Sequence, residues 1–334
     1  MRYSRRDFGK LALAGLPAAA MWKTFGDTTL LAAEKINSKM GGVTIGAITY
    51  SFRTISDPNE IIKAYTTIGL GEMELMSNHA EALAGIPRGA GGGGGRRGGA
   101  PLTPEQIAAR DAAAKAVKDW RASASEATFK PVRQKIADAG IDLRLLCYNM
   151  RDNRTNAEGV LVPGTPDDEI EYAFMMAKWL GVDAISTSTQ VSMARRIAPF
   201  ADKHKMMVGF HGHANTTDTN EVASPETFAA VMAASKYHGA NMDIGHYTEA
   251  GFDPVAFIQQ HHARITNLHL KDKKKASRGG TNGPWGTGDT PIKEVLKLVQ
   301  KNKYKFPCNI EFEYEGDPVT EVTKCLRLCK EMLG

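Results

Sequence analysis

Residues 207–215 read MVGFHGHAN, a short apolar run that ends in two histidines separated by one glycine. The apolar residues predict a buried strand, and a spacing of two residues places His211 and His213 on the same side of it. Such a pair can be two ordinary polar groups satisfied by hydrogen bonds, or it can belong to a metal site. The metal site is the stronger interpretation only if other strands of the chain also end in ligand-type side chains.

The runs of strand character alternate with helical patterns throughout the chain after its first forty residues. One helical pattern, residues 58–69, begins with Pro and ends with Gly, as a capped helix does. Strands that alternate with helices predict a parallel sheet, and eight of them can close into a (β/α)8 barrel. A doubly wound open sheet is the alternative, but no G-x-G-x-x-G motif follows the first strand. We therefore predict a single-domain α/β fold, a TIM barrel over residues 42–332. Its eight strands are predicted at residues 43–52, 72–76, 141–149, 182–188, 206–211, 240–245, 264–270 and 308–314.

One segment interrupts this alternation after the second predicted strand. Residues 88–101, RGAGGGGGRRGGAP, are rich in glycine, and a polar helical stretch follows to about Ser125. Such a composition cannot form a packed core, so residues 88–125 are expected to be an insertion that combines a low-complexity loop with a helix.

The N-terminus has the composition of an export signal. SRRDFGK resembles the twin-arginine motif at Ser4, Arg5, Arg6, Phe8 and Lys10, and a short apolar stretch, residues 11–21, follows. That stretch is too short to span a bilayer, so no stable membrane insertion is expected. We interpret residues 1–33 as a twin-arginine signal peptide and the protein as periplasmic, exported after folding. A basic amphipathic tail is the alternative.

Net charge argues against a nucleic-acid partner. The chain carries +5, but residues 1–33 contribute +3 of it, which leaves +2 for the rest. A chain this nearly neutral lacks the excess of positive charge that binding to nucleic acid requires. The expected partner is a small molecule, and a homo-oligomer is left open.

Polar residues gather at the ends of the last four predicted strands, where a barrel enzyme carries its catalytic groups. The fifth strand ends in the two histidines, and the sixth ends in MDIGH. The seventh ends in NLHLKD and the eighth in IEFEYE. The residues concerned are His211, His213, Asp243, His246, His269, Lys271, Asp272, Glu311, Glu313 and Glu315.

Acidic side chains repeated along a buried strand are costly unless they are paired or bound to a metal. Any one of these residues alone could be a satisfied or solvated polar group, but four consecutive strands converge on the same end of the barrel. Imidazole and carboxylate ligands suit Mn, Co, Zn or Fe better than Mg. The sequence therefore predicts a divalent metal site.

GFHGH, MDIGH, LHLKD, WGTGDTPIKEVL and IEFEYE, in this order, resemble the xylose-isomerase-like barrel superfamily. That superfamily includes sugar phosphate isomerases/epimerases and inosose dehydratase-type enzymes. The resemblance covers about residues 43–332, and GEMELMSNHAEALAGIP (residues 71–87) resembles members that act on exported, non-phosphorylated sugars.

The resemblance implies one metal ligand from each of strands five to eight, in the family usually Glu, Asp, His and Glu. Asp243, His269 and Glu311 match the last three positions, with Glu313 as the second choice for the eighth strand. The first position here is His211 instead of Glu. This departure argues against a two-base epimerisation and leaves one-sided proton removal intact.

The remaining polar residues are candidates for the chemistry around the metal. Glu313, His246, Lys271 and His213 are expected to transfer protons or contact substrate. Glu74, Tyr148 and Asn149 are expected to bind substrate, with a salt bridge inside the barrel as the alternative for Glu74.

The resemblance implies removal of a proton next to a carbonyl of a sugar, through an enediolate. A metal-dependent sugar isomerase or epimerase is the first expectation. A lyase or dehydratase acting on 3-keto-glycosides or keto-inositols is the second, and a non-catalytic carbohydrate-binding barrel is the third. An endonuclease of the same superfamily is disfavoured by the balanced charge and by the lack of further His and Glu ligands.

Overall fold

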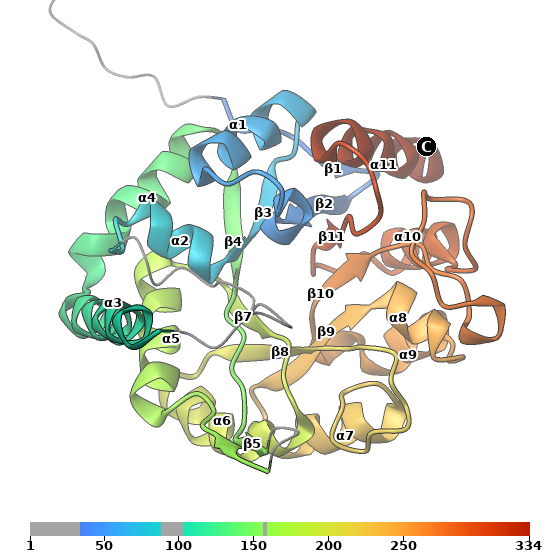
Figure 1. The fold of residues 1–334 in the computed structure, drawn as a ribbon. Coiled ribbons are helices and arrows are strands. Elements are labelled where there is room, and N and C mark those ends of the chain that lie inside the picture. The colour runs from blue at the N-terminus through green and yellow to red at the C-terminus, as the bar shows by residue number, and fades with distance from the viewer. Residues whose placement is uncertain (1–33, 88–102, 156–158) are drawn as a thin grey trace, which may run out of the picture. The chain divides into compact units, whose positions relative to one another are not determined.

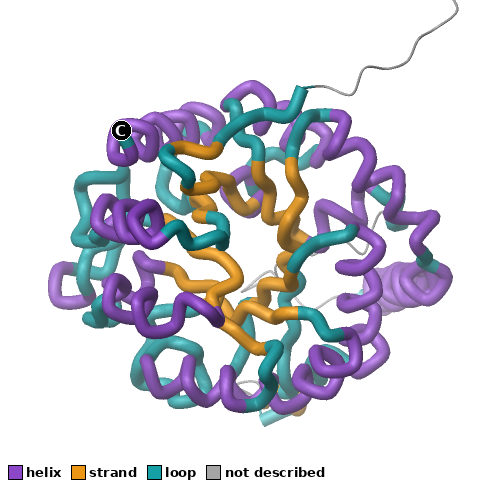
Figure 2. Tube along the Cα trace, turned by 180° about the vertical axis from the view of Figure 1, so that it is seen from behind, coloured by secondary structure: helices purple, strands orange, loops and turns teal. Residues whose placement is uncertain are grey.

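A closed ring of parallel strands, surrounded by helices, forms the body of the protein (Figures 1 and 2). The computed structural model describes residues 34–87, 103–155 and 159–334. The predicted signal peptide, residues 1–33, and the glycine-rich part of the predicted insertion lie outside the described residues.

The eight barrel strands are hydrogen-bonded in the ring order β2, β3, β4, β7, β8, β9, β10, β11, and β11 pairs with β2 to close it. Every one of these pairings is parallel, which confirms the predicted (β/α)8 TIM barrel. The strands are β2 (Val43–Ile48), β3 (Glu72–Met76), β4 (Asp142–Cys147), β7 (Ala184–Thr187), β8 (Met207–His211), β9 (His238–Asp243), β10 (Ile265–Leu270) and β11 (Cys308–Ile310).

Three short strands lie outside the ring. β1 (Lys39–Met40) pairs antiparallel with β2, and β5 (Arg154–Thr155) forms a small antiparallel pair with β6 (Leu161–Val162). The β5–β6 pair follows β4, so it belongs to the rim at the carboxyl ends of the strands.

The helices cover the outside of the ring (Figure 2). Asp57 caps α1 at its start, and Gly69 ends it with a φ of 87°, a left-handed conformation that favours glycine. The helices are α1 (Pro58–Ile68), α2 (Ser77–Leu83), α3 (Pro104–Ser123), α4 (Glu126–Asp138), α5 (Asp167–Leu180), α6 (Val191–His204), α7 (Pro225–Ala233), α8 (Ile244–Glu249), α9 (Pro254–His261), α10 (Ile292–Asn302) and α11 (Pro318–Leu333). Short 3-10 turns occur at η1 (Thr49–Phe52), η2 (His262–Arg264) and η3 (Ala276–Arg278).

Helix α3 lies at the periphery of the barrel and has no buried residue. Its C-terminal turn is nevertheless fixed in place, because Arg121 forms ion pairs with Glu81 of α2 at 2.7 Å and with Glu169 of α5 at 2.8 Å. None of the described helices is both long and apolar enough to cross a membrane.

The inside of the barrel is polar, while the outward faces of the same strands are apolar. On β10, Asn267 and His269 alternate with Leu268 and Leu270, and all four are buried. The outward leucines join the core that lies between strands and helices. This alternation with a period of two gives the barrel interior its chemistry.

The last strand is shorter than predicted, ending at Ile310 instead of residue 314. The reason lies in its neighbour, because β2 ends at Ile48 and turns into η1. Ser51 of that turn takes the place of a strand partner. Its hydroxyl donates to the Ile310 carbonyl at 3.0 Å and accepts from the Phe312 amide at 2.9 Å.

Candidate functional site

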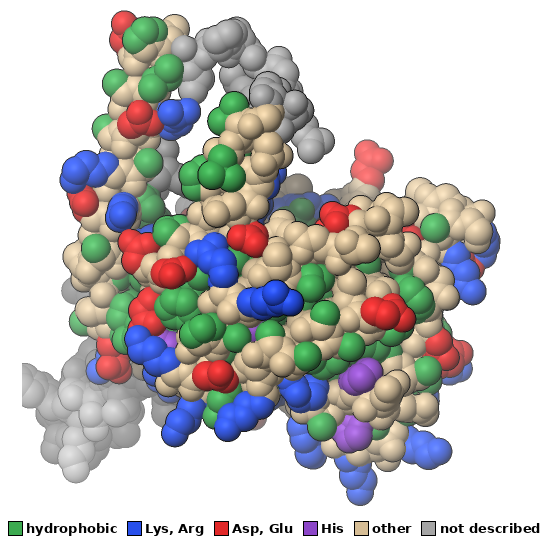
Figure 3. All heavy atoms as spheres, turned by 90° about the horizontal axis from the view of Figure 1, so that it is seen from below, with side chains coloured by type: hydrophobic (Ala, Val, Ile, Leu, Met, Phe, Trp, Pro, Cys, Tyr) green, Lys and Arg blue, Asp and Glu red, His purple; other side chains and the backbone are tan. Residues whose placement is uncertain are grey.

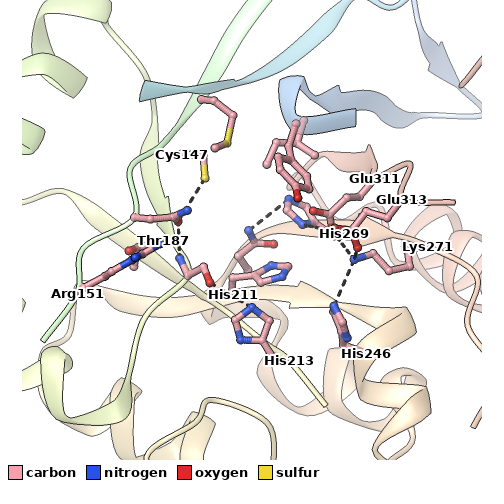
Figure 4. A pocket seen from close by; sticks show the side chains of 16 residues that line it. Cys147, Arg151, Thr187, His211, His213, His246, His269, Lys271, Glu311 and Glu313 are labelled. Atoms are coloured by element: carbon pink, nitrogen blue, oxygen red, sulfur yellow. Dashed lines mark hydrogen bonds and ion pairs between the residues drawn. The ribbon is translucent and has the colours of Figure 1, made fainter. Parts of the chain in front are cut away.

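A cavity of about 430 Å³ opens at the carboxyl ends of the barrel strands (Figure 4). Histidine and carboxylate side chains line one side of it, and Cys147, Arg151 and Thr187 lie on the other side. The complete lining is Ile48, Tyr50, Met76, Cys147, Asn149, Arg151, Thr187, Ser188, His211, His213, Asn241, His246, His269, Lys271, Glu311 and Glu313.

Four buried side chains converge beside this cavity. His211 ends β8, Asp243 ends β9, His269 lies on β10, and Glu311 directly follows β11. Each offers one ligand atom, and these atoms all lie within 4.8 Å of one another. Among the described residues, this is the set of His and acidic side chains whose spacing suits a metal ion, and it is the set predicted from the sequence.

Two atoms of the set lack a hydrogen-bond partner although they are buried. These are Nδ1 of His211 and Oδ2 of Asp243, although Oδ2 does face the ammonium of Lys271 at 3.1 Å. Burial lowers the pKa of His211 well below its ordinary value, so the imidazole stays neutral and keeps a lone pair for a ligand. A buried polar atom without a partner is costly, and a bound cation would satisfy Nδ1 of His211 and would share Oδ2 of Asp243 with Lys271. The side chains therefore fit a divalent metal.

Helix geometry fixes the other oxygen of Asp243. This residue is the N-cap of α8, and its Oδ1 accepts a hydrogen bond of 2.7 Å from the amide of His246. The cap orients the carboxylate, and Oδ2 lies 3.1 Å from Nζ of Lys271, which lines the cavity.

His269 is held between two carboxylates. Its Nε2 lies 2.7 Å from Oε2 of Glu74, and its Nδ1 lies 3.0 Å from Oε2 of Glu311. Burial opposes a charge on this ring, but Glu74 and Glu311 outweigh burial and raise the pKa of His269 well above its ordinary value. Nδ1 faces Glu311, another candidate ligand, so this nitrogen is placed to hold a metal while Nε2–H donates to Glu74.

Lys271 places its ammonium among three carboxylates. Nζ lies 3.1 Å from Oδ2 of Asp243 and 2.9 Å from Oε2 of Glu311, and it also pairs with Glu313. Burial opposes the charge, but these neighbours raise the pKa of Lys271 above its ordinary value. The lysine is therefore a cation in the site, suited to donate hydrogen bonds.

His246 and His213 also line this cavity (Figure 4). The Nε2 atom of His246 lies 3.3 Å from Nζ of Lys271, and its Nδ1 lies 3.4 Å from Glu249. Both ring nitrogens of His213 have partners, since Nε2 lies 3.1 Å from the hydroxyl of Ser188 and Nδ1 pairs with Glu221.

Two of the three glutamates that follow β11 belong to the site. Glu311 joins the candidate ligands, and Glu313 lines the cavity through its contact with Lys271. Glu315 is exposed and does not line the cavity. All three are predicted at the end of the eighth strand, but that strand has already ended at Ile310.

Of the three residues expected to bind substrate, only Asn149 lines the cavity. Tyr148 lies outside it, because its side chain faces outward and its hydroxyl donates to Glu169 of α5 at 2.8 Å. Glu74 lies fully buried inside the barrel, where it forms the ion pair with His269 that was the alternative expectation.

Sequence reasoning missed several lining residues. Asn241 lies two positions before Asp243 on β9, and Cys147 lies two positions before Asn149, so a period of two would have placed both on the inward face. Ser188 directly follows β7 at the same end of the barrel. Arg151 carries no such signal, because it lies in a loop beyond β4.

Solved structures share this fold over most of their length. A sugar phosphate isomerase/epimerase from Parabacteroides distasonis ATCC 8503 is 15% identical, with a TM-score of 0.56 over 90% of this chain and 99% of that one. The probable 3-DHS dehydratase AsbF from Bacillus anthracis is 14% identical, with a TM-score of 0.57 over 86% and 98% of the two chains. The IOLI protein with a bound zinc atom is 9% identical, with a TM-score of 0.55 over 87% and 96%.

At these identities the likeness concerns the fold alone. No curated protein matches the sequence. A family does match it, over residues 108–332, which is more than half of the chain. The chain belongs to the xylose isomerase-like TIM barrel family.

Proposed function

We propose that this protein is a divalent-metal-dependent sugar isomerase or epimerase that removes a proton next to a carbonyl. The observation that carries the proposal is the position of His211, Asp243, His269 and Glu311 beside the cavity that Glu313, His246 and Lys271 also line. The candidate metal-binding residues and the candidate acid–base groups thus lie around one cavity that is large enough for a small substrate.

A bound divalent ion supplies a Lewis acid that polarises a carbonyl and a neighbouring hydroxyl. The chain itself supplies the proton transfer. Glu313 is a carboxylate at the cavity wall and His246 an imidazole, and either can act as a general base within reach of a bound sugar. Lys271 touches Glu313 and lies close to His246, so its ammonium can stabilise the negative charge that develops on the substrate oxygen.

The cluster is also suited to a cation by charge. Glu74, Asp243, Glu311 and Glu313 bring four carboxylates, against the ammonium of Lys271 and the imidazole of His269. A divalent ion would offset part of this excess. Because the ligand set is complete, we place an enzyme ahead of a non-catalytic carbohydrate-binding barrel.

A lyase or dehydratase is the second candidate, and one observation favours it. At the end of β8 the chain has His211, so the cavity offers a carboxylate base, Glu313, from the β11 side only. Removal of a proton from one face suffices for elimination of a neighbouring group. The same site can therefore serve a 3-keto-glycoside or a keto-inositol as well as an isomerising sugar.

The two candidates differ in their products. The metal-loaded protein is incubated in D2O with a panel of keto-sugars and 3-keto-glycosides, and the products are followed by NMR and mass spectrometry. Deuterium incorporation with the carbon skeleton and all substituents retained supports the isomerase. Loss of water or of the aglycone supports the lyase. No incorporation with any member of the panel would contradict both.

A further inference from the structure

A second cavity of about 350 Å³ borders the first one at the rim of the barrel. It lies toward the β5–β6 pair, away from Lys271, Glu311 and Glu313, none of which lines it. The two cavities share the lining residues Asn149, Arg151, Ser188 and His213. The second cavity, which we call the side cavity, therefore adjoins the first at these four residues.

The side cavity presents hydrogen-bond donors that no described residue occupies. The amide of Asn149 accepts from the Ser188 amide through Oδ1, and its Nδ2 has no described partner. The amide of Gln190 likewise accepts from the Asp152 amide through Oε1, which leaves its Nε2 available. The guanidinium of Arg151 forms no ion pair within the described parts of the chain. Asn149, Gln190 and Arg151 thus place three donor groups in the wall of one cavity, which suits a molecule rich in acceptor oxygens.

The acidic groups of the side cavity are already paired. Asp152 lies 3.6 Å from Arg196, and Glu221 pairs with His213. Val162 of β6 and the following Pro163 add an apolar patch to the wall. Donors beside an apolar patch match a sugar ring, which has hydroxyl groups along its edge and C–H bonds on its face.

The groups suited to proton transfer lie elsewhere, apart from the shared His213. The candidate metal ligands, with His246, Lys271 and Glu313, line only the first cavity or lie beside it. Pockets of about 300–1,000 Å³ hold drug-sized ligands, so the first cavity alone is enough for one sugar ring and the side cavity offers comparable space for another. The side cavity therefore has the character of a binding subsite and not of a second reaction centre.

We propose that the substrate is a two-ring glycoside, with the reacting sugar at the candidate metal site and a second hydroxylated ring in the side cavity. Only the assignment of the first ring rests on the proposed function. The contribution of the second ring is a matter of affinity, which can be measured without turnover.

The test is isothermal titration calorimetry of the full-length protein with maltose, cellobiose and lactose, each compared with glucose and galactose. At least one disaccharide is expected to bind about tenfold or more tightly than either single ring. Val162→Trp, which fills the side cavity, should abolish this preference. Leu161→Trp is the matched control, because Leu161 lies next to Val162 on β6 but is 62% exposed and does not line the side cavity.

A second variant, Arg151→Met, removes a donor without filling the space, and it should reduce the preference for two rings even if Val162→Trp does not fold. The proposal is overturned if no disaccharide binds better than glucose or galactose, including the case in which none binds. It is also overturned if Leu161→Trp loses the preference as fully as Val162→Trp. Failure of the proposed function looks different: no keto-sugar exchanges a proton, while the preference for two rings remains.

Discussion

The Nε2 atom of His269 on β10 lies 2.7 Å from Oε2 of Glu74 on β3, three strands away around the barrel. Glu74 is fully buried and also accepts hydrogen bonds from Asn267 at 2.9 Å, from Asn309 at 3.0 Å and from Ser186. The carboxylate of Glu74 on β3 thus links this strand to β7, β10 and β11. It fixes the ring orientation of His269 and leaves Nδ1 for the metal.

Glu74→Gln should weaken metal binding by about 10–100-fold, the usual effect of losing a carboxylate that orients a metal-bound histidine. The amide keeps the size of the side chain but cannot hold Nε2–H as a carboxylate does. Affinity is measured by titration of the metal-free protein with Mn²⁺ or Zn²⁺. Glu331→Gln, at an exposed position on α11, should bind as the parent does, and equal affinity in Glu74→Gln would show that Glu74 does not position His269.

Glu313→Gln and His246→Asn should each lower kcat by about 10²–10⁴-fold if each takes part in proton transfer. Both residues line the cavity without belonging to the candidate ligand set, so metal content should stay at the parent level. The measurement pairs turnover of the best keto-sugar with metal analysis of the same samples.

Two outcomes would redirect these assignments. Near-normal turnover in both variants would move the base to another residue, with His213 the next to test. Loss of the metal in Glu313→Gln would make Glu313 the ligand in place of Glu311. His211→Glu should retain the metal and adds a carboxylate at the end of β8, so newly acquired epimerase activity in that variant would support the one-sided assignment.

Glu72 gives a prediction about stability. Its carboxyl lies inside the barrel beside Gly46, and neither oxygen has a described hydrogen-bond partner. Burial, together with the nearby Glu74, raises the pKa of Glu72 well above its ordinary value of 4.5. The folded state therefore binds this proton more tightly than the unfolded state does. The stability that the protonated group contributes is complete below pH 4.5 and is lost as the pH rises toward the folded-state pKa.

Glu72→Met removes this dependence, so its free energy of unfolding should exceed that of the parent by an amount that grows with pH. The growth can reach about 1.4 kcal/mol per pH unit above pH 4.5, measured by urea unfolding. Glu331→Met, where the side chain is exposed, should show a difference that does not change with pH. A constant difference for Glu72→Met would mean that Glu72 is ionised in the folded protein.

The sequence predicts the barrel well because each strand is a short apolar run bounded by a helix pattern. The predicted strands differ from the observed ones mainly in where they end. The predicted eighth strand runs on to residue 314 because EFEYE keeps the alternation of a strand. The structure ends it at Ile310 because Ser51, remote in sequence, takes over the hydrogen bonds of a partner strand.

The period of two along a strand explains both why the candidate ligands could be predicted and why the substrate-binding role expected for Tyr148 was wrong. Strand ends and a period of two bring polar side chains of the last four strands to the inside of the barrel, and the family resemblance selects His211, Asp243, His269 and Glu311 among them. Tyr148 follows the inward Cys147, so the same rule sends its side chain outward to Glu169. The ion pair between Glu74 and His269 depends on three-dimensional closure of the ring, which no local pattern contains.

Export can be tested independently of catalysis. We propose that Arg5 and Arg6 are read by the twin-arginine system, so replacing both by Lys should leave a folded, metal-loaded protein in the cytoplasm. Cell fractionation followed by immunoblotting measures the distribution. Undiminished delivery of the double variant to the periplasm would show that the two arginines are not a signal.

The proposed function requires the metal site, and the amount of metal per chain tests that site directly. The purified protein, dialysed against dilute divalent metal, should hold about one ion per chain by mass spectrometry of the elements. His269→Ala and Asp243→Asn should hold close to none, while His262→Ala, a histidine of η2 that stacks on Tyr304 away from the cavity, should hold as much as the parent. Full occupancy in both ligand variants, or no ion in the parent, would contradict a metal site at these residues.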